Sequence, residues 1–293
     1  MQAIQTDNLT KYYGHARGIE GLDLEVEAGE FFGFIGPNGA GKSTTIRTLL
    51  GLIAPTGGSA RMLGLDIRTQ RQEILRQVGY LPAEAFFYPG QRVRDVLRLS
   101  AGLRRKDCTT TARELCRRLQ LDTNAKVDAL SFGNRKKVGI VCALQHDPAL
   151  LILDEPTGGL DPLMQREFFA ILRERNAAGT TVFLSSHILS EVQRHCTRAG
   201  VIRDGRLIAC GKVEDLANTG ARRVLVRGTP DLTGLPGVRG LEHLEDGVCF
   251  LYSGSMQPLL QTLAAASVRD VQITEPDLEE VFLHYYTQGG DPA

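Results

Sequence analysis

Short apolar runs alternate with longer amphipathic segments over the first 215 residues of the chain. Runs of strand length lie at 26–35 (interrupted at 28–30), 150–153, 181–184, 201–203 and 207–209. Apolar residues at helical spacing lie at 42–50 and 163–175. Asp161 is the predicted N-cap of the second of these helices, because its carboxylate suits that position and Pro162 suits the first turn. The alternation of strands and helices predicts an α/β fold with a parallel sheet.

A different pattern occupies residues 84–146. Three segments with helical periodicity, 92–103, 111–119 and 135–145, follow one another with no predicted strand between them. The pattern predicts a helical subdomain inserted into the α/β domain.

The last part of the chain has its own pattern. Residues 219–236 are rich in glycine and proline and are predicted as a loop. Strands are predicted at 248–252 and 271–274, with a helix at 256–266 between them. A final helix is predicted after Pro276, where Leu278, Val281, Phe282 and Tyr285 form one apolar stripe. We therefore predict a first domain at 1–219 and a small α+β domain at 220–293.

Composition narrows the class of protein. The 293 residues are 42% hydrophobic and 23% charged, as in ordinary globular proteins, and the net charge is zero. Charge is uneven, since residues 231–293 carry ten acidic and two basic side chains. No apolar run approaches the ~18 residues of a membrane-spanning helix, and the N-terminus does not resemble a signal peptide, so a cytosolic location is expected. The six cysteines form no CxxC pair, and neither a zinc site nor a redox motif is indicated.

One segment carries a specific chemical signal, the pattern G-x-x-x-x-G-K-[ST]. It consists of Gly36, Pro37, Asn38, Gly39, Ala40, Gly41, Lys42, Ser43 and Thr44. Glycines let backbone N–H groups approach phosphate oxygens, Lys42 reaches the β- and γ-phosphates, and the Ser43 hydroxyl is a ligand for Mg²⁺. A strand precedes the segment and a helix follows it, which is the context that a phosphate-binding loop requires.

An apolar strand that ends in two acids supports this interpretation. Asp154 and Glu155 follow the run 150–153, at the strand end where α/β sheets bind ligands. Asp154 is the predicted second ligand of Mg²⁺, and Glu155 is predicted to orient or deprotonate the attacking water.

At this point residues 2–215 resemble the ATP-binding subunits of ABC transporters. The segment 130–134, Leu-Ser-Phe-Gly-Asn, is similar to the family signature LSGGQ. The resemblance implies that Tyr13 stacks on adenine, that Asp161 belongs to the D-loop and that His187 is the switch histidine at the γ-phosphate. It also implies that Ser131, Gly133 and Asn134 face the nucleotide of a second subunit. A homodimer or a paired ATPase subunit, with ATP at the interface, is therefore expected.

Two positions depart from the family pattern. Ala83 stands where the Q-loop glutamine is usual, and two interpretations stay open. The adjacent Glu84 replaces the glutamine, or the loop only transmits motion. Gly158 stands in the D-loop where serine or alanine is commoner. Because Lys42 and Glu155 are present, ATP hydrolysis is still expected.

The signature, the segment 161–165 and the closing segment 275–282 resemble bacterial export subunits of the drug and bacitracin type. That resemblance implies a separate membrane permease, docked at the helical subdomain, a position on the inner face of the cell membrane, and no nucleic-acid partner. The alternative is a soluble ABC ATPase that acts on ribosomes or nucleic acid through the basic clusters 104–106, 135–137 and 222–223. Such proteins usually carry two ATP cassettes or a long coiled coil, and this sequence has one phosphate loop. A third hypothesis is a regulatory protein without ATPase activity, and Ala83 is the only residue that supports it.

Overall fold

The computed structural model of the chain describes residues 1–217 and 222–274. The chain divides into two compact units, Met1–Gly211 and a second unit that begins at Lys212. The domain boundary predicted at 219/220 and the last predicted helix, with Leu278 and Tyr285, lie outside the described residues. Among the residues that are described, no helix is both long enough and apolar enough to cross a membrane.

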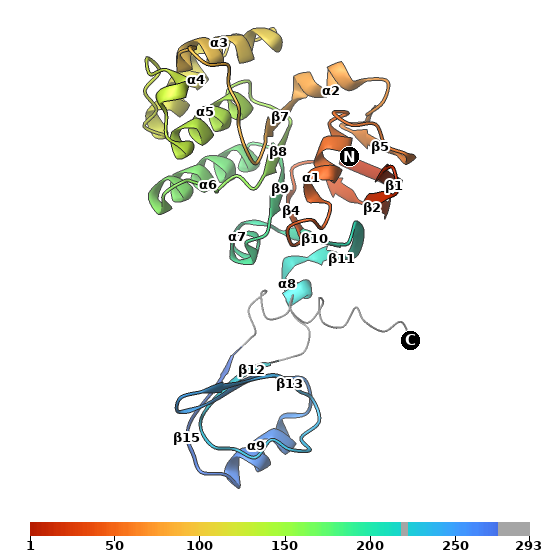
Figure 1. The fold of residues 1–293 in the computed structure, drawn as a ribbon, viewed down its shortest axis with the longest axis vertical. Coiled ribbons are helices and arrows are strands. Elements are labelled where there is room, and N and C mark those ends of the chain that lie inside the picture. Colours follow the sequence, from red (N-terminus) through yellow and green to blue (C-terminus); the bar gives the residue numbers. More distant parts are fainter. Residues whose placement is uncertain (218–221, 275–293) are drawn as a thin grey trace. The chain divides into compact units, whose positions relative to one another are not determined.

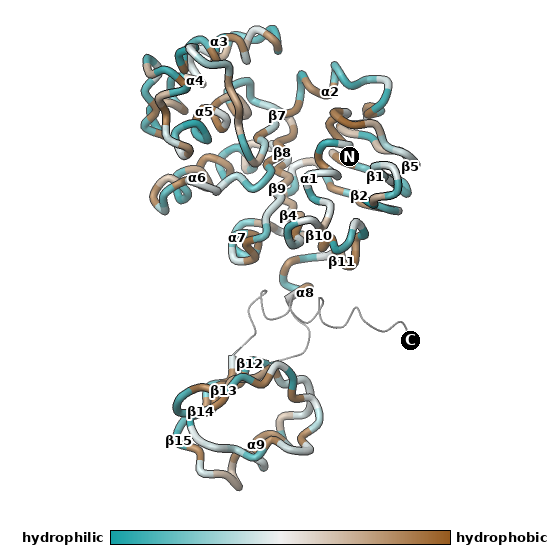
Figure 2. The backbone as a smooth tube through the Cα atoms, in the orientation of Figure 1, coloured by the Kyte–Doolittle hydropathy of each residue, from teal (hydrophilic) through white to brown (hydrophobic). Residues whose placement is uncertain are grey.

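A six-stranded sheet runs through the first unit in the order β11-β10-β4-β9-β8-β7 (Figure 1). Its strands are β4 (Phe31–Ile35), β7 (Val78–Leu81), β8 (Leu150–Asp154), β9 (Thr181–Ser186), β10 (Arg198–Arg203) and β11 (Arg206–Lys212). The pairs from β10 through β4, β9 and β8 to β7 are parallel, as predicted. All residues of β4, β8 and β9 are buried, and Figure 2 shows the hydrophobic positions along β8 and β9. The carboxyl ends of these strands therefore meet at one edge, where a ligand site is expected.

A second, antiparallel sheet belongs to the same unit. It contains β1 (Gln2–Tyr13), β2 (Ala16–Leu22), β3 (Glu25–Glu27), β5 (Gly57–Met62) and β6 (Leu65–Asp66). Sequence patterning predicted only the region of β3. The reason is that these strands alternate buried and exposed residues, so that β1 buries Ile4 and Leu9 but exposes Asp7, and no long apolar run marks them.

The helices of the first unit are α1 (Lys42–Leu49), α2 (Arg71–Gln77), α3 (Val93–Leu103), α4 (Thr109–Arg118), a short 3₁₀ turn (Val127–Ala129), α5 (Phe132–Leu144), α6 (Pro162–Ala177) and α7 (Leu189–His195). Five of them, α1, α3, α4, α5 and α6, agree with predicted segments, whereas α2, α7 and the short 3₁₀ turn were not predicted. Helices α3, α4 and α5 gather on the side of the unit away from β1 and β2 (Figure 1). The insertion is thus helical, as predicted, and the Asp161 carboxylate caps α6 by accepting a hydrogen bond of 3.0 Å from the Met164 N–H.

The second unit contains α8 (Val213–Ala217), α9 (Met256–Ala264) and a four-stranded antiparallel sheet, in agreement with the predicted α+β class. Its strands are β12 (Arg222–Gly228), β13 (Val238–Leu244), β14 (Gly247–Tyr252) and β15 (Val268–Thr274), in the order β13-β14-β12-β15. The prediction of a loop over 219–236 is wrong at β12. Val224 and Val226 are fully buried there against Phe250 and Leu259, and the only glycine of this short alternating segment is its last residue, Gly228.

Candidate functional site

The turn between β4 and α1 has the backbone of an anion-binding loop. Gly39 and Gly41 have φ angles of 82° and 109°. A Cβ at Gly36 would lie 2.4 Å from the Ile202 carbonyl oxygen, and one at Gly41 would lie 2.8 Å from the Gly18 carbonyl oxygen. Glycine is therefore required at both positions by close approach of other main chain. The first turn of α1 then offers its N–H groups to an anion.

A cleft of about 220 Å³ opens beside this loop. Its lining residues come from the β1–β2 hairpin, the loop, the start of α1 and the end of β8: Tyr13, Arg17, Gly18, Pro37, Asn38, Gly39, Gly41, Lys42, Ser43, Thr44 and Glu155. The fold thus brings the predicted adenine-stacking residue, the phosphate loop and the predicted base to one place. Two other predicted loop residues, Gly36 and Ala40, are buried.

Arg17 and Gly18 are cleft residues that the sequence analysis missed. The hairpin pairs Tyr12 with Arg17 and Tyr13 with Ala16, which returns β2 past the phosphate loop. Gly14, with a φ angle of 60°, makes this turn. The only signal in the sequence is that glycine between two short segments of alternating character, and it does not indicate which other segment the hairpin faces.

Three predicted catalytic side chains converge at the cleft. The Lys42 ammonium donates hydrogen bonds to the carbonyl oxygens of Gly36 (2.6 Å) and Pro37 (3.1 Å), and it lies 3.4 Å from Glu155 Oε1. His187 Nδ1 lies 3.2 Å from the same Oε1 atom. One carboxylate oxygen therefore stands between an ammonium and an imidazole that come from different strand ends.

Asp154 is buried at the end of β8, with 2% of its surface exposed. The Ser185 hydroxyl, on the neighbouring strand β9, donates a 3.0 Å hydrogen bond to Asp154 Oδ1. That bond fixes one oxygen of the carboxylate. Together with the Ser43 hydroxyl at the start of α1, Asp154 offers the hard oxygen donors that Mg²⁺ prefers.

The main chain at Glu155 has an unusual conformation, with a φ angle of 45°. Positive φ is uncommon for a residue with a long side chain and persists only where surrounding contacts hold it. Here the Glu155 N–H donates a 3.0 Å hydrogen bond to the Ser185 carbonyl oxygen, and the Glu155 carbonyl oxygen accepts a 3.0 Å bond from Lys136 Nζ. Two hydrogen bonds to its main-chain groups thus hold the backbone of Glu155, the predicted base.

The segment 131–134 lies elsewhere on the first unit. The Ser131 side chain caps α5 by accepting a 3.3 Å hydrogen bond from the Asn134 N–H. Gly133 packs so closely on the 158–161 loop that a Cβ would lie 2.4 Å from the Gly159 carbonyl oxygen. None of Ser131, Gly133, Asn134 and Asp161 lines the cleft at Lys42. The structure therefore joins the signature and D-loop segments to each other, not to the phosphate loop of the same chain.

Comparisons with known proteins agree with this arrangement. A family model described as "ABC transporter" matches residues 19–158. The bacitracin transport ATP-binding protein BcrA of Bacillus licheniformis is 41% identical over 70% of this chain and 68% of its own length. The chain belongs to the ATP-binding proteins of ABC transporters. Its enzymatic activity is accordingly the hydrolysis of ATP for transport.

Two further comparisons extend this result. The Nod factor export ATP-binding protein I of Cupriavidus metallidurans is 34% identical over 96% of both chains, so the likeness includes the second unit. A solved structure described as the ATP-binding subunit of an ABC transporter is 31% identical, with a TM-score of 0.68 over 73% of this chain and 91% of that chain.

The segment at the Q-loop position of this ABC ATPase is held by its main chain. Lys136 Nζ donates hydrogen bonds to the carbonyl oxygens of Pro82 (3.1 Å) and Ala83 (2.7 Å). The Glu84 side chain is exposed and does not line the cleft at Lys42. Burial lowers the pKa of the Lys136 ammonium to about 8, an effect that the negative charges of Asp154, Glu155 and Glu84 oppose.

The basic cluster at 135–137 is not a charged surface. Only 2% of Lys136 and 9% of Lys137 are exposed. Arg135 is half-buried and donates a 3.1 Å hydrogen bond to the carbonyl oxygen of Leu130, just before the helix. Nucleic-acid backbones are bound by exposed cations. Lys136 and Lys137 therefore do not support the hypothesis of a nucleic-acid partner.

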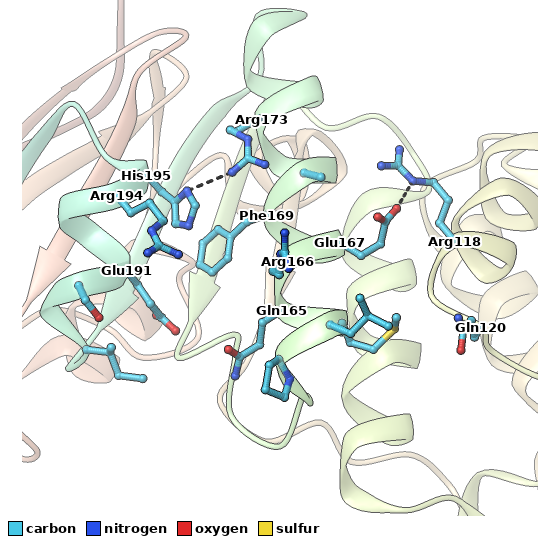
Figure 3. A pocket seen from close by; sticks show the side chains of 16 residues that line it. Arg118, Gln120, Gln165, Arg166, Glu167, Phe169, Arg173, Glu191, Arg194 and His195 are labelled. Carbon is cyan, nitrogen blue, oxygen red and sulfur yellow. Dashed lines mark hydrogen bonds and ion pairs between the residues drawn. The ribbon is translucent and has the colours of Figure 1, made fainter.

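A larger cavity, of about 970 Å³, lies between α6 and α7 and beside Arg118 (Figure 3). Several of its charged and titratable groups have partners within the chain. Arg118 is paired with Glu167, while His195 stacks on Phe169 at 3.8 Å between ring centroids and is hydrogen-bonded to Arg173. None of the predicted site residues lines it. Size alone therefore does not identify the functional site of this ABC ATPase.

Proposed function

We propose that Glu155 is the general base of ATP hydrolysis, that His187 links it to the γ-phosphate and that Lys42 binds the phosphate groups. The observation that carries this proposal is the convergence of Lys42 Nζ and His187 Nδ1 on one oxygen of Glu155. A carboxylate in that place accepts a proton from the attacking water. The ammonium stabilises the negative charge that develops on the phosphate oxygens. Tyr13 supplies the aromatic face for adenine from the same cleft.

Mg²⁺ fits the donors at the start of α1 and the end of β8. The Ser43 hydroxyl and the Asp154 carboxylate would hold it, together with phosphate oxygens and water. Bound there, the ion neutralises charge on the transferred phosphate group. Ser185 contributes indirectly, because its hydroxyl orients the Asp154 carboxylate through the 3.0 Å hydrogen bond.

The complete site forms between two subunits in this proposal. Gly133 and the 158–161 loop lie against each other near the exposed start of α5 and outside the cleft at Lys42. A second subunit that presents the same segments would close the open side of the cleft, with ATP between the two. Symmetric dimers bury the same pair of surfaces twice, so both sites close together.

The names of two relatives support a proposal for the transport direction and the membrane partner. Both the bacitracin transport protein and the Nod factor export protein are named for movement of a compound. We infer that this subunit powers export through a separate permease and works on the inner face of the cell membrane. The helical subdomain over 84–146 is the proposed docking region for that permease.

Replacement of Glu155 by glutamine tests the proposed chemistry. Glutamine keeps the size of the side chain but removes the base, so turnover should fall by about 10²–10⁴-fold while ATP still binds. The variant should also accumulate as an ATP-bound dimer in size-exclusion chromatography with light scattering. Glu167→Gln, on α6 and outside the cleft, is the matched control and should keep wild-type turnover. Wild-type turnover in Glu155→Gln would refute the assignment of the base.

The same variant tests the partner. Tagged Glu155→Gln, purified from detergent-solubilised cells with ATP present, should recover a membrane protein with several spans, identified by mass spectrometry. Recovery of ribosomal proteins or nucleic acid without a membrane protein would support a soluble ATPase instead.

A further inference from the structure

Lys136 is a buried cation whose three donors all bind main chain. Only 2% of the residue is exposed, and its ammonium donates to the carbonyl oxygens of Pro82 (3.1 Å), Ala83 (2.7 Å) and Glu155 (3.0 Å). A lysine ammonium carries three N–H groups, so each one has an acceptor. Among the described residues no carboxylate lies within ion-pair distance of this ammonium. The Lys136 side chain therefore connects helix α5 to three main-chain carbonyl groups by hydrogen bonds.

The three acceptors belong to two segments with separate roles. Pro82 and Ala83 follow β7 and precede the helical subdomain, while Glu155 follows β8. Lys136 itself lies on α5, the helix that begins at the signature segment. One side chain thus joins the signature helix, the entrance of the subdomain and the main chain of the proposed base. Burying a charge for this purpose is costly, and a methionine would fill the same space without that cost.

Of the three acceptors, the Glu155 carbonyl group belongs to the residue whose main-chain conformation most needs a stabilising contact. Its φ angle of 45° places it in a region that residues other than glycine leave unless they are held. On the carbonyl side of this residue the holding contact is the Lys136 hydrogen bond. Rotation of the main chain here would move Glu155 Oε1 away from Lys42 and His187, which lie 3.4 and 3.2 Å from it.

We propose that Lys136 is a positioning residue for ATP hydrolysis, which holds the main chain of Glu155 so that its carboxylate faces the reacting phosphate. This inference rests on the proposed role of Glu155 as the base. Lys136 acts through Glu155 and does not line the cleft for the nucleotide. Its loss should therefore lower kcat and leave ATP affinity unchanged, because the loop at 36–44 keeps its own contacts. Misplacement of a catalytic group by about 1 Å costs on the order of 10²-fold in rate.

The primary test replaces Lys136 by methionine, which has similar length and no donors. In the full chain, kcat should fall at least tenfold, whereas the dissociation constant for a fluorescent ATP analogue should change less than threefold. Lys136→Gln, whose amide supplies two N–H groups, should recover part of the lost kcat. Lys137→Met is the matched control, since it removes a neighbouring buried lysine of α5, and its kcat should stay within threefold of wild type.

A double variant separates positioning from a general loss of packing. If Lys136 acts through the Glu155 carboxylate, adding Lys136→Met to Glu155→Gln should lower the residual single-turnover rate less than twofold. A further tenfold loss in the double variant would overturn the proposal, as would wild-type kcat in a folded Lys136→Met protein or an equal loss of affinity and kcat. If Lys136→Met does not unfold cooperatively on heating, Lys136→Gln decides in its place, and wild-type kcat in that variant overturns the proposal.

The parallel measurement on Glu155→Gln keeps the two proposals distinguishable. Loss of turnover in Glu155→Gln with none in Lys136→Met removes the positioning role and leaves the base assignment intact. Wild-type turnover in Glu155→Gln removes the base assignment, and with it the reason for Lys136 to act through that residue.

Discussion

Two helix N-termini in the first unit are proposed to meet nucleotide phosphates, and they differ in construction. At α1, the loop has positive φ angles at Gly39 and Gly41, and the Lys42 side chain is 5% exposed. At α5, Ser131 is exposed and its hydroxyl is hydrogen-bonded to the Asn134 N–H of the same turn. The residues of the first site line a cleft, whereas the second is an exposed segment whose Gly133 packs on the 158–161 loop.

The difference indicates what each site contributes to ATP binding and to turnover. Convergent donors at α1 can bind an anion within one chain, because the loop, Lys42 and the helix dipole act at one place. The segment at Ser131 has a helix dipole but does not line the cleft at Lys42. It can therefore add binding energy only where another molecule brings the phosphates to it. Affinity of the single subunit should depend on the first site, and turnover on both.

The largest expected effect comes from the α1 side. Lys42→Ala removes a buried ammonium, and a charge-assisted hydrogen bond contributes roughly 1.5–3 kcal/mol, so ATP affinity should fall about 100-fold. Isothermal titration calorimetry on the purified subunit measures this. Lys106→Ala, on an exposed lysine outside the cleft, should change affinity less than twofold. Unchanged affinity in Lys42→Ala would contradict the phosphate-loop assignment.

An intermediate effect is expected on the α5 side. Ser131→Ala should lower turnover about tenfold, equivalent to one hydrogen bond of roughly 1.4 kcal/mol, and leave the ATP affinity of the monomer within twofold. Ser255→Ala is the control, because Ser255 is also an N-cap position but makes no cap hydrogen bond through its side chain. A loss of monomer affinity in Ser131→Ala would show that the two regions bind the same nucleotide within one chain.

A last comparison concerns the stability of the two regions rather than ATP affinity. A Cβ at Gly133 would lie 2.4 Å from the Gly159 carbonyl oxygen, so Gly133→Ala should destabilise the fold by about 1–3 kcal/mol. At Gly39 nothing lies within 4 Å of the added Cβ, and only the φ angle of 82° opposes it, at about 1 kcal/mol. Urea unfolding of the two variants measures the difference. A larger loss in Gly39→Ala would reverse the ranking.

Much of the first unit could be predicted because its central strands have strong local signals. The runs of β4, β8 and β9 are continuously apolar since both faces are covered, and the predicted helices lie within a few residues of α1, α3, α5 and α6. The strands β1, β2, β5 and β12, which alternate buried and exposed residues, were missed. In β12, Val224 and Val226 are buried by Phe250, a partner on another strand that no local pattern identifies.

The candidate site divides in the same way. The phosphate loop and the acids after β8 were predictable because each requires particular residue types at fixed short spacing. Lys136 was not, since in the sequence it stands in a basic cluster that resembles a solvated surface. Its burial depends on Pro82, Ala83 and Glu155, which reach it from two strands of the sheet.

By itself, the sequence determined the class of fold, the phosphate loop, the acidic strand end and the family resemblance. These features depend on local backbone requirements and on spacing along the chain, which the order of residues records directly. Only the tertiary structure decided which of them share a cleft, that Glu155 has positive φ and that Lys136 is enclosed among three carbonyl groups. Those properties depend on how β7, β8 and α5 pack together, because a hydrogen bond between distant segments exists only when the sheet has brought them within its reach.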